Sequence, residues 1–169
     1  MKKWMVVFAM ASLVFCCGQA DAAEETAQEQ VPVAQAAAKY FDEALASIAG
    51  GDVGKGVNLL LEIILLSGPE ESFPEGFKAK IEQTRADIGS GDYAAGGTGI
   101  RDALRIWDPA AEAEAKAAVK RESENQTPLG QIFKDKLTAS RDLFVQGDRK
   151  AAVKGILQAL LLLSPAPGN

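Results

Sequence analysis

The dipeptide Gly-Asp occurs three times in the chain, and a proline follows each aspartate at the same distance of seventeen residues. Hydrophobic residues also recur at fixed places, eleven and four residues before each aspartate and eight and twelve residues after it. Residues at such spacings share one face of a helix, so each copy predicts an amphipathic helix on either side of the dipeptide. The three dipeptides are Gly51-Asp52, Gly91-Asp92 and Gly147-Asp148.

The two residue types of the dipeptide are suited to a turn between helices. Glycine adopts the left-handed backbone conformation that ends many helices at a lower cost than other residues. An aspartate at the start of the next helix can accept hydrogen bonds from its free backbone N–H groups. Repeated acidic residues can also bind metals or act in catalysis, but the repeat favours an architectural role. We therefore interpret Asp52, Asp92 and Asp148 as helix N-caps.

The repeat predicts one all-α domain over residues 34–165. It contains three antiparallel helical hairpins at residues 35–69, 74–109 and 128–165, and the prolines end the second helices. Successive aspartates are 40 and then 56 residues apart. Residues 110–125 account for the longer distance, and their alanine-rich sequence favours a helix with almost no apolar face. We predict an exposed spacer helix there.

The middle unit carries a resemblance to a known family. Gly91-Asp92-Tyr93, followed by Ala103-Leu104 and Asp108-Pro109, resembles the second half of a tetratricopeptide repeat. That resemblance implies an array of helix–turn–helix units that bind peptides or partner proteins in a groove. The distances of 40 and 56 residues depart from the family's period of about 34 residues. Tetratricopeptide-like repeats and a compact helical bundle therefore both remain possible.

The first 22 residues have the three parts of a secretory signal peptide. Lys2 and Lys3 precede an uncharged apolar run at residues 4–17, which is shorter than the roughly 20 residues that span a bilayer. Small residues then mark a predicted cleavage site between Ala22 and Ala23. Residues 23–33 are acidic and are predicted to be disordered. The protein is expected to be exported, to the periplasm or as a secreted protein.

Two alternatives to simple cleavage remain open. A lipid could be attached at Cys16 or Cys17, although neither cysteine follows a small residue as in a bacterial lipoprotein signal. The leader could also stay uncleaved as an anchor. Membrane association is otherwise not expected.

Composition excludes several kinds of chemistry. Histidine is absent, and both cysteines lie in the leader. A chain that begins at Ala23 therefore has no disulfide, no thiolate or imidazole metal ligand and no Cys–His or Ser–His nucleophile. Its net charge is −6, with 16 basic and 22 acidic side chains, which gives no basis for nucleic-acid binding. We expect no catalytic residues, no metal and no cofactor, and thus no enzyme.

The hairpins differ at two positions of their second helices, nine and thirteen residues after the aspartate. These positions hold leucine in the first and third copies and arginine in the second. The leucines could form the core of a closed bundle, a partner or self-association surface, or the wall of a site for an apolar molecule. Candidate partner-binding residues are Leu61, Leu65, Arg101, Arg105, Leu157 and Leu161.

Other residues of the second helices carry smaller predictions. Positions six and ten after the aspartate are polar in every copy and are predicted to face water. Arg101 and Arg105 could join Trp107 in an anion- or peptide-binding patch, but we favour local ion pairs for the arginines and packing for Trp107. The glycines at positions 96, 97 and 99 favour close helix packing over the approach of a ligand.

Two functions agree with these features. The first is a non-catalytic, extracytoplasmic module that binds a protein or peptide, or a further copy of itself. The alternative is a helical carrier or sensor domain for an apolar small molecule or lipid.

Overall fold

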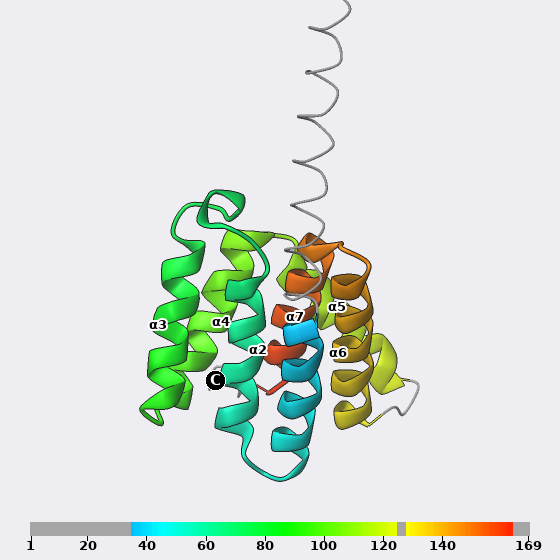
Figure 1. Ribbon diagram of the computed structural model, residues 1–169. Helices are drawn as coiled ribbons and strands as arrows, with labels where there is room; N and C mark the ends of the chain where they lie inside the picture. The colour runs from blue at the N-terminus through cyan, green and yellow to red at the C-terminus, as the bar shows by residue number, and fades with distance from the viewer. Residues whose placement is uncertain (1–34, 125–127, 164–169) are drawn as a thin grey trace, which may run out of the picture. The chain divides into compact units, whose positions relative to one another are not determined.

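A computed structural model describes residues 35–124 and 128–163, and these residues form helices and turns without a strand (Figure 1). The predicted leader, its predicted cleavage site between Ala22 and Ala23, and the two cysteines lie outside the described residues. No helix in the described ranges is long and apolar enough to cross a membrane. The elements are a first helix at residues 35–49, α2 (Val53–Leu66), the short 3-10 helix η1 (Glu70–Ser72), α3 (Phe77–Gly89), α4 (Tyr93–Trp107), α5 (Ala111–Glu124), α6 (Leu129–Val145) and α7 (Arg149–Leu163).

The three Gly-Asp dipeptides form the turns of three helical hairpins. Gly51, Gly91 and Gly147 have φ angles of 91°, 88° and 87°, in the left-handed region that glycine adopts most readily. Each following aspartate accepts a hydrogen bond through Oδ1 from the backbone N–H three residues later, at 3.0, 2.9 and 3.1 Å. The carboxylates therefore cap the amino ends of α2, α4 and α7.

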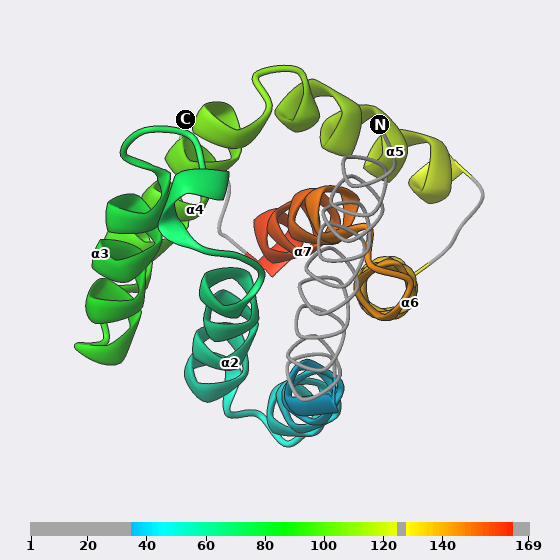
Figure 2. The ribbon, with the colours of Figure 1, turned by 45° about the horizontal axis from the view of Figure 1, so that its top comes forward.

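Helix α7 lies among the other helices and is buried around most of its circumference (Figure 2). It contacts α2, α4, α5 and α6, all within one compact unit that begins at residue 36. Leu157 of α7 and Leu61 of α2 have no exposed surface, so the interpretation of these two leucines as a partner surface is wrong. They form core because the chain closes into a bundle in which α2 meets α7. Leu65 and Leu161 are half-buried.

Residues 111–124 form the predicted helix, but one of its faces is docked on the bundle, so the expectation that the spacer is exposed holds for only part of its surface. Ala111 and Ala115 of α5 are buried, because these small side chains let α5 pack closely on α4 and α7. Gln158 of α7, at a position that we predicted to face water, is also buried. Its Nε2 donates a hydrogen bond to the backbone oxygen of Ala111 at 3.0 Å. The polar face of α7 is thus covered by α5.

The glycines of α4 allow α3 and α4 to approach closely. A methyl group at Gly96 would overlap Ile88, and one at Gly99 would overlap the hydroxyl of Thr84. Gly155 of α7 has the same relation to Ser140 of α6. Close packing within hairpins therefore explains these glycines.

Candidate functional site

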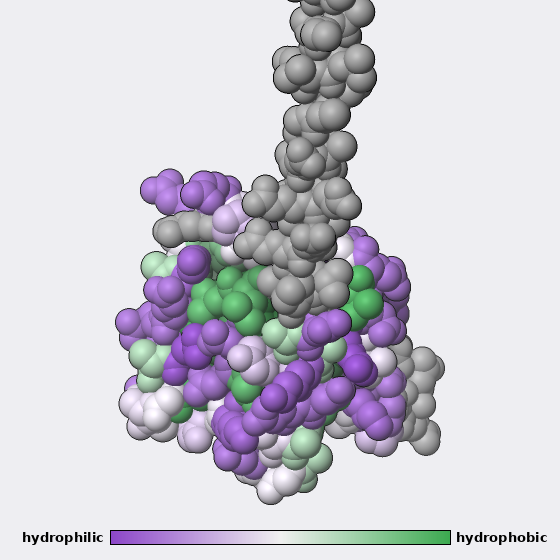
Figure 3. Space-filling view, in the orientation of Figure 1, coloured by the Kyte–Doolittle hydropathy of each residue, from purple (hydrophilic) through white to green (hydrophobic). Residues whose placement is uncertain are grey.

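A cleft of about 480 Å³ opens where the carboxyl ends of α2 and α4 meet the amino end of α7. Figure 3 shows hydrophobic surface near the same end of α2, bordered by hydrophilic residues. We call this site the Trp107 cleft. Its lining consists of Ser67, Gly68, Pro69, Ser72, Phe73, Pro74, Trp107, Arg149 and Lys150.

Aromatic rings form one side of the Trp107 cleft. The ring of Trp107 lies 6.0 Å from that of Phe73 and 4.8 Å from that of Phe77, measured between centroids. Phe73 and Phe77 stack on each other at 5.5 Å. The indole Nε1 of Trp107 donates a hydrogen bond to the backbone oxygen of Lys150 at 3.3 Å, which fixes the ring beside α7. The prediction that Trp107 packs describes only part of its environment, since its half-exposed ring also lines the cleft.

Two cations also line the cleft. One guanidinium nitrogen of Arg149 donates a hydrogen bond to the backbone oxygen of Ser67 at 3.0 Å, and Arg149 forms no ion pair with the described residues. Lys150 has no ion pair within the same residues either, although its charge helps to lower the pKa of Asp108. The larger cause of that lowered pKa is the hydrogen bond from Lys154 to Asp108, at 2.7 Å. The cleft thus presents positive charge on an acidic protein.

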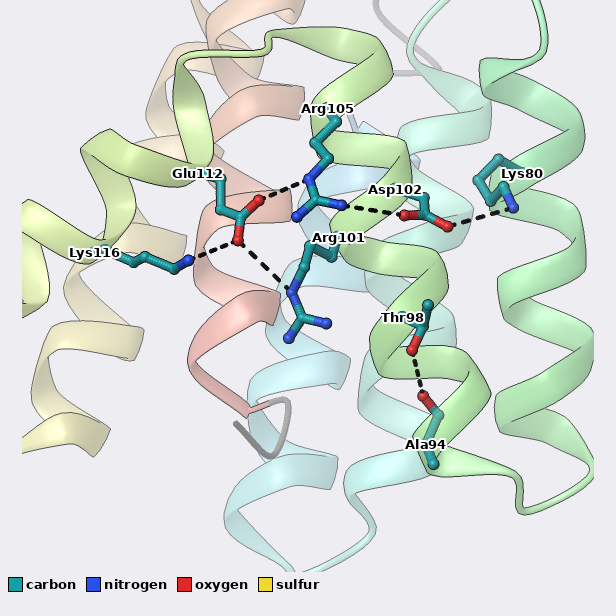
Figure 4. A network of polar contacts seen from close by, with 8 residues as sticks. All are labelled: Lys80, Ala94, Thr98, Arg101, Asp102, Arg105, Glu112 and Lys116. Atoms are coloured by element: carbon teal, nitrogen blue, oxygen red, sulfur yellow. Dashed lines mark hydrogen bonds and ion pairs between the residues drawn. The ribbon is translucent and has the colours of Figure 1, made fainter. Parts of the chain in front are cut away.

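Arg101 and Arg105 do not line this cleft and pair with Glu112 of α5 instead (Figure 4). Their Nε atoms lie 3.8 and 2.9 Å from the carboxylate oxygens of Glu112. Lys116 lies 2.8 Å from the same carboxylate and, followed by Arg105, keeps the pKa of Glu112 below its ordinary value. Arg105 also pairs with Asp102 at 3.7 Å. The structure therefore separates the two arginines from Trp107.

Sequence reasoning missed Phe73, Arg149 and Lys150 as neighbours of Trp107. A signal was present at the third turn, where Asp148 is followed by two cations and the other two copies have uncharged residues. Phe73 lies in the segment between α2 and α3, outside the repeated positions. Its approach to Trp107 depends on the closure of the bundle, which the repeat alone does not specify.

The described residues contain no group of three or more acidic side chains placed to hold a metal ion. Comparisons with protein-family models, curated proteins and solved structures give no match to this chain. The tetratricopeptide likeness of the middle hairpin therefore stays a prediction.

Proposed function

We propose that the protein is a non-catalytic binding module that acts outside the cytoplasm. Its Trp107 cleft takes a segment of a partner protein or peptide in which a carboxylate stands next to an apolar side chain. The observation that supports this proposal is the pairing of an aromatic wall with the cations of Arg149 and Lys150 in one open cleft.

The aromatic and the cationic residues of the cleft suit the two parts of such a ligand. An apolar side chain placed against Trp107 and Phe73 would remove aromatic surface from water, which favours binding. A carboxylate beside it would meet Arg149 and Lys150 and form charge-assisted hydrogen bonds. Tryptophan and arginine are also the residue types that most often anchor protein interfaces.

The hydroxyl groups in the cleft donate hydrogen bonds to the backbone, which favours a binding role over a role as catalytic nucleophiles. Ser67 donates its hydroxyl hydrogen to the backbone oxygen of Ile64 at 2.6 Å, and Ser72 donates to that of Pro69 at 2.7 Å. The ionisable residues of the lining are a guanidinium and an ammonium, neither of which is a ready general base at neutral pH. Placement outside the cytoplasm is part of the proposal because of the leader at residues 1–22.

Trp107 itself provides the test of peptide binding. The chain has a second tryptophan, Trp4 in the leader, so a Trp4→Phe variant leaves Trp107 as the sole indole. Its fluorescence would be titrated with peptides that end in phenylalanine, with either a free or an amidated carboxyl end. We expect the free acid to change the emission and to bind more tightly than the amide.

Charge reversal at Lys150 tests the cationic side of the cleft. Lys150→Glu should weaken binding of the free acid about tenfold, because it replaces an attraction by a repulsion. Lys39→Glu makes the same change at an exposed lysine outside the cleft and should leave the affinity unchanged. Equal affinities for acid and amide, or equal effects of the two substitutions, would contradict the proposal.

A further inference from the structure

A second, apolar pocket lies at the opposite ends of the helices. Its volume is about 550 Å³, and it opens between the carboxyl half of the first helix and the amino half of α6. Leu45, Ile48, Leu129 and Phe133 line it from these two helices, and Leu163 of α7 closes one side. We call it the Leu163 pocket. It shares no residue with the Trp107 cleft.

Small residues keep this pocket open. Toward its other end, the first helix is held to α6 by an edge-to-face contact between Phe41 and Phe144, with ring centroids 6.4 Å apart, and by an ion pair between Asp42 and Arg141 at 3.4 Å. At the pocket the lining includes alanines and Gly130, and a methyl group added to Gly130 would meet nothing within 4 Å. The two helices are therefore joined at one end and leave apolar side chains accessible at the other.

Apolar surface continues past Leu163 to a neighbouring pocket. That pocket, of about 190 Å³, lies among α2, α4 and α7, and Leu163 lines it as well. Val53, Tyr93 and Leu129, three of the five large hydrophobic side chains that are exposed in the described residues, line one pocket or the other. Exposed apolar surface gathered at one end of a domain is typical of a binding site.

One charge lies at this apolar surface. Lys134 is the only charged residue in the lining of the Leu163 pocket, and it forms no ion pair with the described residues. Several other cations of the fold have a carboxylate partner, as Lys55, Arg85 and Lys154 do. An apolar pocket of several hundred cubic ångströms with one polar group that fixes orientation is the usual form of a small-molecule site.

From these observations we infer that the Leu163 pocket binds a single-chain amphiphile with a carboxylate head group, of the fatty-acid class. The hydrocarbon chain lies among Leu45, Leu129, Phe133 and Leu163, and the carboxylate pairs with Lys134. The inference is independent of the Trp107 cleft, so failure of either proposal leaves the other standing.

Chain length and head group give the first test. Calorimetry with the purified protein would compare decanoate, dodecanoate and the methyl ester of dodecanoate. Each added methylene buried in the pocket should tighten binding about fourfold. The ester should bind up to about fivefold more weakly than the acid, because it lacks the charge that pairs with a partly exposed lysine. Equal affinity for decanoate and dodecanoate would overturn the assignment of the pocket.

Two variants and a control locate the site. Gly130→Leu fills the pocket without a steric conflict at Cβ and replaces glycine by a better helix former, so it should abolish dodecanoate binding while the fold is retained. Lys134→Gln should remove the difference between acid and ester. Lys78→Gln, at a lysine on α3 outside the pocket, should bind like the wild type. Binding that survives Gly130→Leu would overturn the inference, as would a dimer that this substitution dissociates, since a second copy would then be the occupant.

Discussion

The second helices of the middle and third hairpins begin in the same way and end in different surroundings. Both α4 and α7 follow a Gly-Asp turn with an aspartate cap. Nine residues after that aspartate, α4 has Arg101 and α7 has Leu157. Arg101 faces Glu112 of α5, whereas Leu157 is fully buried in the centre of the bundle. The repeated residues thus determine the hairpin, and the residues that differ determine what packs beside it.

Truncation of the two equivalent side chains should give the largest contrast. Leu157→Ala leaves a cavity in the core and should lower the free energy of unfolding by about 3 kcal/mol. Arg101→Ala removes one cation from Glu112, which still pairs with Lys116. The free energy of unfolding should therefore fall by less than about 1 kcal/mol. Urea unfolding followed by circular dichroism measures both. Leu161→Ala, on the same helix but half-buried, should fall between them, and equal losses for all three would contradict the comparison.

Helices α4 and α7 share the aspartate cap. Removing the cap should therefore lower the free energy of unfolding by the same amount in both. Asp92→Ala and Asp148→Ala each remove one hydrogen bond to a backbone N–H at the start of a helix. We expect a loss of about 1 kcal/mol in each case, because the N–H group is left to water. Asp→Asn at either position should restore most of the stability, since its side-chain oxygen can also accept the bond. A large difference between the two alanine variants would show that these turns are not equivalent.

The hairpins could be predicted from the sequence because local chemistry determines them. Glycine at positive φ and aspartate as a cap act within a few residues, and the apolar spacing fixes which helix faces pack. The docking of α5 could not be predicted in this way. In the sequence, the side of α5 that carries Ala111, Glu112 and Ala115 has the composition of a solvent-exposed helix face. Only the fold places the arginines of α4 and Gln158 of α7 beside it.

The candidate sites were less predictable than the fold, for the same reason. The Trp107 cleft joins residues 67–74, Trp107, Arg149 and Lys150, which come together only when α7 takes its central place. The Leu163 pocket lies between the first helix and α6, and although Ile48 is at a repeated apolar position, the repeat does not show that the first and third hairpins meet there. Of the residues that the sequence singled out, Leu61 and Leu157 serve the core, and Arg101 and Arg105 hold α5.

The attachment of α5 to α4 should give the smallest effect and should depend on pH. The pKa values of Glu112 and Asp108 are lowered by their cationic partners, so the stabilisation is complete above the pKa of the unfolded chain and is lost as the pH falls through the folded-state values. We expect Glu112→Gln to cost under about 1 kcal/mol at neutral pH, because its partners Arg105 and Lys116 are exposed to water, which screens both pairs. At about pH 3.5, below the ordinary pKa of a glutamate, the same substitution should cost less, since the unfolded wild-type chain then binds a proton at this carboxyl more readily than the folded chain does. Urea unfolding at both pH values measures this difference, with Glu82→Gln on α3 as a control outside the network. If Glu112→Gln lowers the free energy of unfolding by the same amount at both pH values, charge does not hold α5 on α4. The packing of Ala111 and Ala115 would then be the main contact between the bundle and α5.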